Sequence, residues 1–438
     1  MTKTISARRE PRDLFDVVII GGGMVGLALA RALVELSSPA FEKLGQASPK
    51  LKIAIIEARL PSLDFSPSSA EAYQPDLRVS AINGGIIEQL STWGLWTEEH
   101  FPYRSMVRHM EIWDENSEGK LVFHASDSGE EYLSYIVENR FMVKALWESL
   151  QAFPEVTFFS PNECKWESLA KGSETPGLEW HLELQDGQKI SANFLVGADG
   201  ANSKVRALLG MSAEPVLYGQ QAIVANILSE KSHSKTAYQR FLTQGPLAFL
   251  PLNIKGSANS ELMSSIVWTT STVEAESLMA LSASEFELKL EEAFGHRLGK
   301  LTLVQNRASF PLRHHHAASY VGEGTKSGAL LIGDAAHGIH PLAGLGVNLG
   351  FHDVGLLTEI LREAKAKNRP LLTQQNFKKY ERQAWAYNEG IRQSMTAINA
   401  VFSKGPSLDL FRKIRGSGMN LVNRFDIVKK LFSRAAQG

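Results

Sequence analysis

The 438-residue sequence is poor in the features that several classes of protein require. Its single cysteine, Cys164, excludes an intrachain disulfide and a thiolate metal cluster, which fits a reducing compartment. Basic residues number 46 and acidic residues 47, so the overall charge gives no reason to expect a nucleic-acid partner. No apolar run approaches the roughly 20 residues that span a bilayer, and the opening MTKTISARREPRD has no apolar core for a signal peptide. With 44% hydrophobic and 21% charged residues, we expect a globular protein of about two or three domains.

Several catalytic patterns are absent as well. The sequence has neither the GxxxxGK[ST] loop of nucleotide hydrolases nor the GxSxG turn of serine hydrolases. His314, His315 and His316 are consecutive, and neighbouring strand residues point to opposite faces, so we do not expect them to bind a metal together. His337 and His340 come without the carboxylate partners that a redox iron site needs, and we expect them to pack within a loop. The sequence therefore predicts no metal site.

The first motif present is a glycine-rich turn between a strand and a helix. Residues 14–20 are almost continuously apolar, as in a strand buried on both faces of a parallel sheet, and GGGMVG follows them. Gly21 permits the turn, Gly23 lets the backbone approach a pyrophosphate, and Gly26 allows close packing of the helix. The phosphates of a dinucleotide would lie at the N-terminus of that helix.

A second apolar strand, LKIAIIEA, ends near an acidic residue, Glu57, which is placed to bind a ribose hydroxyl of the dinucleotide. Glu57 lies farther along than the roughly 20 residues that usually follow this motif. The reason is the insertion SSPAFEKLGQASPK (residues 37–50), which we expect to be a surface loop. The alternative for Glu57 is a solvated carboxylate at the end of the strand.

Two later strands also run into glycine-bearing turns, FLVGADG ending at Gly200 and ALLIGDAA ending at Ala336. Ligands bind at the carboxyl ends of strands in an open parallel sheet, so we expect the three turns to converge on one ligand. Asp199 and Asp334 are then placed to bond hydroxyls on its sugar-like part. An extended ligand touched by all three turns fits FAD better than NAD, whose site needs only the first half of the pattern.

The trio GGGMVG, GADGANSKVR and GDAAHGIHPLAGLGVNLG resembles the flavin-dependent aromatic hydroxylases, which carry these three motifs in this order. DLRVSAINGGIIEQLSTWGLW, SYIVENRFMVKALWESL, TQGPLAFLPL and RASFPLRHHHAASYV are similar to the ubiquinone-biosynthesis branch of that group. The resemblance runs from about residue 14 to the C-terminus. It implies an α/β fold in which a Rossmann-like FAD-binding domain is interleaved with a smaller β-sheet substrate domain and followed by C-terminal helices.

The resemblance also implies roles for residues of this chain. Asp334 would contact the ribityl chain of noncovalently bound FAD, and amides of the following loop would stabilise charge at the pyrimidine end of the flavin. Pro341 would lie beside the reacting edge of the ring. Leu345 stands where the family usually has glutamine, so any contact of that side chain is lost. The implied cofactor residues are Gly21, Gly23, Met24, Val25, Gly26, Glu57, Arg78, Asn139, Asp199, Asp334, Gly344, Gly346, Val347 and Asn348.

Three further polar residues lie near these motifs, and two of them have two interpretations each. Arg78, in DLR, matches an arginine that contacts FAD in the family, and the alternative is a surface salt bridge. Asn139 aligns with a position where the family has a flavin-contacting arginine or glutamine. Arg206, at the end of the Asp-Gly motif, either holds that turn or pairs with a phosphate.

The resemblance predicts FAD-domain segments at 1–78, 104–212 and 300–360, a substrate domain at 79–103 and 213–299, and a C-terminal helical region at 361–438. YQRFLTQGPLAFLPL and SSIVWTT alternate like half-buried strands of a sheet that roofs the active site. Phe249, Pro251 and Trp268 are candidates to line an aromatic pocket, and otherwise they form the core of this sheet. Arg240 is the obvious basic candidate for the pocket.

The implied chemistry is monooxygenation, in which FAD reduced by NADPH or NADH reacts with O2 to give a flavin hydroperoxide that hydroxylates an electron-rich ring. In the resembling branch the ring belongs to a polyprenyl phenol or quinol. One alternative is a soluble catabolic hydroxylase of a small aromatic acid, whose carboxylate Arg240 would hold. The other is a non-catalytic subunit that binds FAD for stability in a membrane-associated biosynthetic complex.

The C-terminal segment, residues 403–438, carries eight basic against two acidic residues. From residue 419 its apolar residues recur at helical spacing, which predicts a basic amphipathic helix suited to an anionic membrane surface or an acidic partner. The alternative is a helix that packs on its own FAD domain or on a second copy of the chain. We expect a cytoplasmic protein peripherally associated with the inner membrane.

Overall fold

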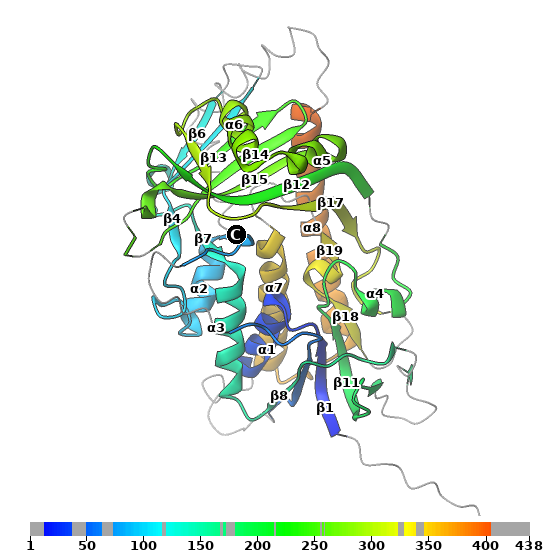
Figure 1. The fold of residues 1–438 in the computed structure, drawn as a ribbon. Coiled ribbons are helices and arrows are strands. Elements are labelled where there is room, and N and C mark those ends of the chain that lie inside the picture. The colour runs from blue at the N-terminus through cyan, green and yellow to red at the C-terminus, as the bar shows by residue number, and fades with distance from the viewer. Residues whose placement is uncertain are drawn as a thin grey trace, which may run out of the picture.

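The computed structural model describes residues 13–36, 50–63, 73–115, 120–166, 170–171, 180–213, 216–254, 256–257, 259–322, 328–338 and 346–403. These residues form a lower unit around a mostly parallel sheet and an upper unit around a mostly antiparallel sheet, here called the roof sheet (Figure 1). The long helix α8 (Gln374–Ser403) extends from the lower unit to the roof sheet. No helix of the described ranges has the length and apolar character needed to cross a bilayer.

The lower sheet consists of apolar strands whose residues are buried on both faces. Val18, Ile19 and Ile55 are each 0% exposed, as expected for a parallel sheet covered on both sides. β10 pairs antiparallel with β11 and β9, whereas the other pairings are parallel. The strand order is β8 (Val156–Phe159), β2 (Ile53–Ile56), β1 (Asp13–Ile20), β11 (Lys189–Gly197), β10 (Trp180–Glu183) and β9 (Ala170–Lys171), with β18 (Ala329–Leu331) on the carboxyl half of β11.

Helices pack against this sheet and against one another. α1 (Met24–Leu36) follows β1 after the glycine-rich turn, and its alanines Ala28, Ala30 and Ala32 are fully buried. α1 contacts α3 (Asn139–Gln151) and α7 (Gly346–Ala366), and α7 in turn contacts α8. The short helix α4 (Lys204–Leu208) follows β11. The predicted Rossmann-like arrangement of strand, glycine turn and helix is confirmed.

A small three-stranded sheet lies beside the lower unit. It contains β3 (Val79–Ile82), β7 (Ser134–Glu138) and β4 (Ser105–Val107), and α2 (Gly84–Thr92) follows β3. Ile82 and Leu90 are fully buried in the same core as β1 and α1. Residues 79–103, which we predicted in the substrate domain, thus contribute apolar side chains to the core that they share with β1 and α1.

The roof sheet has nine strands in the described part of the chain. α5 (Thr272–Ala280) and α6 (Ala283–Phe294) pack on its outer face, where they share a second hydrophobic core with the sheet. The order is β19 (His337–Gly338), β17 (Ala308–His316), β12 (Val216–Ser229), β15 (Met263–Ser271), β14 (Gly245–Pro251), β13 (Thr236–Leu242), β5 (His109–Asp114) and β6 (Lys120–His124), with β16 (Leu301–Leu303) also on β12.

The roof sheet recruits strands from segments that were predicted to lie in the FAD domain. β5 and β6 form a hairpin that continues the sheet through a parallel pairing of β5 with β13. β16 and β17 pair with β12 from the other side. These assignments were missed because a strand's partner is set by long-range pairing, which the local alternation of side chains does not reveal.

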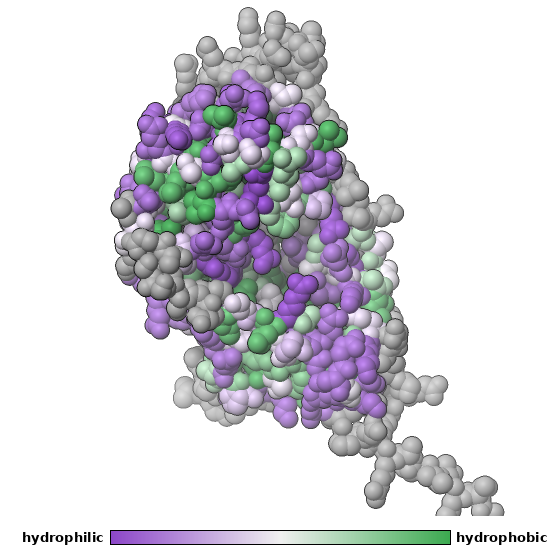
Figure 2. Space-filling view, viewed as in Figure 1, coloured by the Kyte–Doolittle hydropathy of each residue, from purple (hydrophilic) through white to green (hydrophobic). Residues whose placement is uncertain are grey.

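The two units enclose a cleft. The molecular surface is hollowed between the roof sheet and the lower unit, and hydrophilic residues border much of the opening (Figure 2). The top of α7 and the loops at the carboxyl ends of the lower strands point toward this cleft (Figure 1).

Candidate functional site

The carboxyl ends of the central strands of the lower sheet meet at one edge. Ile20 at the end of β1 is paired with both Ile56 of β2 and Gly197 of β11, and Gly197 is paired with Leu331 of β18. The backbone confirms this alignment, because the amide of Ala198 donates to the carbonyl of Ile20 over 2.8 Å. The three glycine-bearing turns therefore converge, as the sequence predicts.

The glycines of the first turn differ in what surrounds them. Gly21 has φ +112°, and a Cβ there would lie 2.3 Å from the carbonyl oxygen of Ala198. A Cβ on Gly26 would lie 2.0 Å from the carbonyl oxygen of Gly21, so this glycine is needed for close packing of α1 on the turn. A Cβ on Gly23 would meet no atom within 4 Å. Gly23 therefore faces open space, as expected for the glycine beside a pyrophosphate.

This difference predicts that Gly23→Ala folds like the wild type but binds FAD at least about tenfold more weakly, since the new methyl group occupies the approach of the pyrophosphate. Gly26→Ala is the matched control, because its methyl group would clash within the protein and lower stability. FAD titration of the apoprotein and urea unfolding measure the two effects. Equal FAD affinity in Gly23→Ala and wild type would contradict the assignment.

Glu57 holds the glycine-rich turn from the next strand. Its carboxylate accepts hydrogen bonds from the amides of Gly22 at 2.7 Å and Arg59 at 3.0 Å. Glu57 is thus more than a solvated strand-end carboxylate, because it fixes the turn that would cradle the phosphates. Binding of a ribose hydroxyl by the same carboxylate remains a prediction. The insertion between α1 and β2 lies almost entirely outside the described residues.

The two aspartates of the later motifs have different surroundings. Both carboxylate oxygens of Asp199 are engaged within its own turn, where Ser203 Oγ donates at 2.5 Å and the amide of Lys204 at 2.7 Å. The described residues offer no hydrogen-bond donor to the Asp334 carboxylate, and this side chain is exposed. Asp199 therefore shapes the Asp-Gly turn, whereas Asp334 is free to bind a ligand hydroxyl.

The Asp334 residue is exposed, yet the surrounding protein shifts the ionisation of its carboxyl group. Desolvation raises the pKa of Asp334, while His337 opposes the shift and Asp353 adds to it. A ligand that donates hydrogen bonds to the carboxylate would compensate for this loss of solvation. Sugar-like hydroxyls are such donors.

A buried ion pair lies directly behind the Asp334 turn. Asp353 of α7 is 0% exposed, and its Oδ2 accepts hydrogen bonds from His337 Nε2 at 2.6 Å and from the amide of Gly333 at 2.9 Å. Asn388 of α8 donates to Oδ1 at 3.2 Å. Burial alone would lower the pKa of His337, but the charge and hydrogen bond of Asp353 raise it above its ordinary value. His337 therefore has a buried carboxylate partner, whereas the sequence suggested a loop-packing residue without one.

Two of the consecutive histidines have hydrogen-bond partners within the protein, and the cysteine is buried. His315 bonds the carbonyl of Asp334, and His316 bonds Glu389 of α8. Within the described ranges there is no group of three or more side chains suited to hold a metal ion. Cys164 is buried, and burial raises the pKa of its thiol to about 12, so the thiol stays protonated.

Val25, at the start of α1, brings the first and third motifs together. A Cβ on Gly333 would lie 3.2 Å from its side chain, and a Cβ on Gly350 would lie 2.4 Å away. Arg206 joins the second and third motifs, since its guanidinium donates to the carbonyls of Ala201 and Ala335, both at 2.8 Å. The structural interpretation of Arg206 is thus supported, and Met24 lies half-buried at the first position of α1.

The loop after the third motif is only partly described. Pro341, Gly344 and Leu345 lie outside the described residues, and His340 does as well. Gly346 and Val347 begin α7, with their amides at its N-terminus. The side chain of Asn348 accepts from the amide of Asn83 at 3.1 Å and donates to the carbonyl of Ala81 at 2.8 Å. Asn348 therefore holds the start of α2. Because its side chain bonds other protein groups, we expect any contact of this residue with the flavin to come from its backbone.

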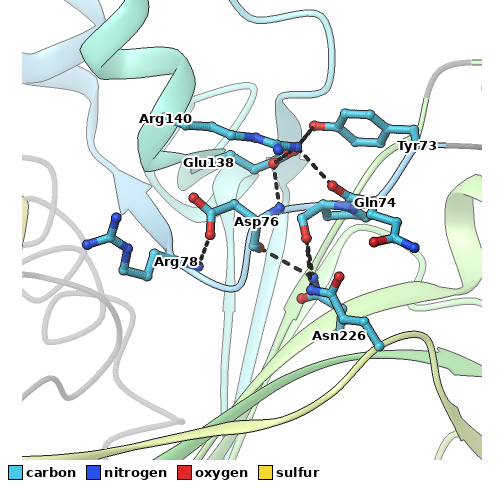
Figure 3. A network of polar contacts seen from close by, with 9 residues as sticks. Tyr73, Gln74, Asp76, Arg78, Glu138, Arg140 and Asn226 are labelled. Carbon is cyan, nitrogen blue, oxygen red and sulfur yellow. Dashed lines mark hydrogen bonds and ion pairs between the residues drawn. The ribbon is translucent and has the colours of Figure 1, made fainter. Parts of the chain in front are cut away.

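Arg78 and Asn139 are neighbours across two elements. The amide of Asn139 donates to the carbonyl of Arg78 at 3.0 Å, and the Asn139 side chain accepts from Ser80 Oγ at 2.7 Å. The Arg78 side chain is exposed and points away from the polar network around it (Figure 3). Its guanidinium makes no salt bridge to another described residue, so the surface salt bridge gains no support.

The predicted pocket residues of the roof sheet point the wrong way. Phe249 stacks on Phe294 of α6 with ring centroids 3.8 Å apart, and Trp268 contacts Phe286 of the same helix. Arg240 donates to the carbonyl of Ala293 at 2.8 Å on this outer side. Pro251 is two residues beyond Phe249 in β14 and so shares its face. The pocket interpretation of these four residues is wrong, because α5 and α6 pack on this face of the sheet. The alternative, that they form the core of the sheet, holds for Phe249 and Trp268.

The inner face of the roof sheet was missed by the sequence reasoning. Asn226 of β12 bonds a residue of the lower unit, so its side chain lies on the inner face. Directly opposed residues of an antiparallel pair share a face, so the register of the strands gives the other residues of the inner face. Strand alternation combined with the two helices that follow β15 was the available signal. The inner-face residues of the four central strands include Ala222, Val224, Asn226, Leu228, Ala248, Leu250, Met263, Ser265, Val267, Thr269, Ala308 and Phe310.

The geometry fits FAD rather than a shorter nucleotide. The open backbone at Gly23, the turn held by Glu57 and the uncommitted carboxylate of Asp334 lie at successive strand ends of one edge. The top of α7 extends the same line toward the cleft below the roof sheet (Figure 1). A ligand that follows this line is long, and its far end reaches the boundary between the two units.

Comparisons with known proteins agree with this geometry. The FAD binding domain family matches residues 68–384. The chain is 32% identical to 3-demethoxyubiquinol 3-hydroxylase of Escherichia coli (strain K12), over 97% of this chain and 98% of that protein. It is also 32% identical to the mitochondrial ubiquinone biosynthesis monooxygenase COQ6 of Drosophila melanogaster, over 99% of this chain and 92% of that protein.

Solved structures show the same fold at lower identity. p-Nitrophenol 4-monooxygenase PnpA from Pseudomonas putida DLL-E4 superposes with a TM-score of 0.71 at 17% identity, over 97% of this chain and 99% of that one. P. aeruginosa PqsL in complex with 2-aminobenzoylacetate gives 0.70 at 18% identity, over 93% and 100%. With the nearly full-length curated relatives, these findings show that the chain belongs to the FAD-binding-domain family of aromatic-ring monooxygenases, in the branch of the ubiquinone-biosynthesis hydroxylases.

Proposed function

We propose that this FAD-dependent monooxygenase hydroxylates the aromatic ring of a polyprenyl phenol or quinol in ubiquinone biosynthesis. The observation that carries the proposal is the inner face of the roof sheet, whose named side chains are mostly apolar and include no charged residue. A buried carboxylate without a charged partner costs several kcal/mol. This wall therefore suits an uncharged ring with a hydrocarbon chain. The two relatives, a 3-demethoxyubiquinol 3-hydroxylase and a ubiquinone biosynthesis monooxygenase, support the same substrate class.

The small aromatic acid of the competing hypothesis loses its binding residue. Arg240, the basic side chain suggested for holding a carboxylate, is bonded to the carboxyl end of α6 on the outer face. Phe310 of β17 is 45% exposed on the inner face, where it offers an apolar surface toward the cleft.

FAD, when bound, takes electrons from NADPH or NADH and activates O2 for transfer to the ring. The protein holds the dinucleotide through the Gly23 backbone, Glu57 and Asp334. The amides of Gly346 and Val347 lie at the N-terminus of α7, where they favour negative charge. The roof sheet covers the cleft and keeps water from the reacting ring.

The test uses purified protein loaded with FAD and supplied with NADPH or NADH and air. A short-chain polyprenyl phenol should be converted to a product heavier by one oxygen atom, whereas a ring of the same substitution with a carboxylate in place of the chain should not. Preferential hydroxylation of the acid would overturn the proposal. FAD binding without hydroxylation of either compound would favour the non-catalytic subunit.

We also propose that the chain associates peripherally with the inner membrane through its basic C-terminal segment, which lies outside the described residues beyond position 403. A chain without residues 417–438 should lose binding to vesicles that contain anionic lipid while keeping its FAD, because the lost segment supplies much of the basic charge. Vesicle flotation measures this, with neutral vesicles as the control. Equal flotation of both chains, or no flotation of the full chain, would contradict the membrane role.

A further inference from the structure

The segment that carries Arg78 is held from two sides by residues of different units (Figure 3). From the lower unit, Glu138 at the end of β7 is 5% exposed and accepts the amide of Asp76 at 2.7 Å. Glu138 also accepts the hydroxyl of Tyr73 and pairs with Arg140 at 2.7 Å. Arg140 in turn donates to the carbonyl of Gln74 at 2.9 Å.

From the roof sheet, Asn226 of β12 reaches down to the same segment. It is 0% exposed, and its Nδ2 donates to the carbonyls of Pro75 at 2.9 Å and Asp76 at 3.3 Å. Gln305 supports it with a hydrogen bond of 3.0 Å to the Pro75 carbonyl. Both backbone groups of Asp76 are thus fixed, the amide by the lower unit and the carbonyl by the roof sheet.

The contacts of Glu138 and Asn226 with Asp76, here called the clamp, also fix the backbone of Arg78. The guanidinium of Arg78 takes no part in them. Its amide donates to Asp76 Oδ1 at 3.1 Å, and its carbonyl accepts from Asn139. The side chain points away from the network (Figure 3). β3 follows immediately and leads to Ala81 and Asn83, which bind Asn348 at the top of α7. Asp76 therefore controls where the Arg78 side chain begins, next to the elements that border the flavin end of the site.

We propose that Asn226 is a positioning residue of the roof sheet that places the Arg78 guanidinium against FAD and so couples cofactor binding to docking of the roof sheet. The proposal rests on the proposed FAD contact of Arg78. Ordinary packing does not explain Asn226 well, because its Oδ1 is buried without a hydrogen-bond partner in the described structure. An apolar residue of similar size would avoid that unpaired acceptor, whereas the Nδ2 donor is what the clamp requires.

The experiment is a double-mutant cycle on FAD affinity with Asn226→Ala, Arg78→Ala and the double variant. Each single change should weaken FAD binding roughly tenfold, about the effect of one hydrogen bond. If Asn226 acts through Arg78, adding Asn226→Ala to Arg78→Ala should weaken binding by less than about twofold, since interacting sites are not additive. Ser264→Ala removes a buried, unpartnered hydroxyl on the outer face of β15 and should leave FAD affinity unchanged.

Three results would overturn the inference. Additive losses would show that Asn226 acts on stability alone, and urea unfolding of the apoproteins would then show a matching decrease. An unchanged affinity in Asn226→Ala would show that the clamp is dispensable. An unchanged affinity in Arg78→Ala would remove the contact on which the inference depends, while FAD binding and ring hydroxylation by the wild type would still stand as separate tests of the proposed function.

Discussion

Asp334→Ala is expected to bind FAD roughly tenfold to a hundredfold more weakly than the wild type. The carboxylate has no donor among the described residues, the residue is exposed, and the proposed FAD site places the carboxylate to accept hydrogen bonds from ribityl hydroxyls. Charge-assisted hydrogen bonds contribute about 1.5–3 kcal/mol, which sets this range of affinity. Titration of the apoprotein, followed by quenching of flavin fluorescence, measures the loss.

Asp334→Asn separates the charge from the shape of the side chain. The amide keeps one oxygen acceptor and the size of the carboxylate, so its loss of affinity should be smaller than that of alanine. The unfolding free energy of the Asp334→Ala apoprotein should stay near the wild-type value, because the carboxylate makes no hydrogen bond that the fold requires. Equal FAD affinity in all three proteins would exclude Asp334 from the cofactor site.

The convergence of the three motifs could be predicted because each rests on a local pattern. An apolar strand followed by a glycine-bearing turn fixes where its carboxyl end lies in a parallel sheet. The positive φ of Gly21 and the tight packing at Gly26 follow from the spacing of the motif. Asp334 and Asp199 looked equivalent in the sequence, and only the hydrogen bonds of Ser203 and Lys204 distinguish them.

The roof sheet could not be predicted to the same extent. Alternation identified its strands but not which face looks toward the cleft, and a change of face reverses the role of every side chain. Phe249 and Trp268 were chosen because they are aromatic, yet the helices that follow β15 bury the bulky face. The carboxylate partner of His337 lies 16 residues farther along, on α7, so neither the local motif nor its spacing reveals the ion pair.

This ion pair leads to the second prediction, that Asp353→Asn lowers the free energy of unfolding by about 3–5 kcal/mol at mildly acidic pH. The substitution keeps the size of the side chain and an oxygen for the amide of Gly333, but it leaves the His337 imidazolium buried without its counter-charge. Glu359→Gln on the same helix breaks the exposed pair with Arg362 and should cost at most about 1 kcal/mol. Urea unfolding of the apoproteins gives both values.

The loss in Asp353→Asn should depend on pH in a defined direction. In the wild type the pKa of His337 is raised above its ordinary value of 6.5, so this contribution is complete below that pH and disappears as pH rises through the raised value. In the variant, burial without Asp353 would lower the pKa of His337, and protonation would then destabilise the fold as pH falls. The difference between the two proteins should therefore be greatest at acidic pH and shrink toward alkaline pH.

The other titrating groups near His337 are Asp334, His315, His316 and His352. The charge of Asp353 raises the pKa of Asp334 and of His352, so its removal lowers both, and each change also makes the loss greater at acidic pH. The double variant Asp353→Asn with His337→Gln removes both charges and should recover part of the stability lost at acidic pH, since no buried charge is left unpaired. A difference that is constant with pH, or that grows toward alkaline pH, would show that His337 is neutral in the fold. Asp353 would then hold the Asp334 turn through the amide of Gly333 and Asn388 alone.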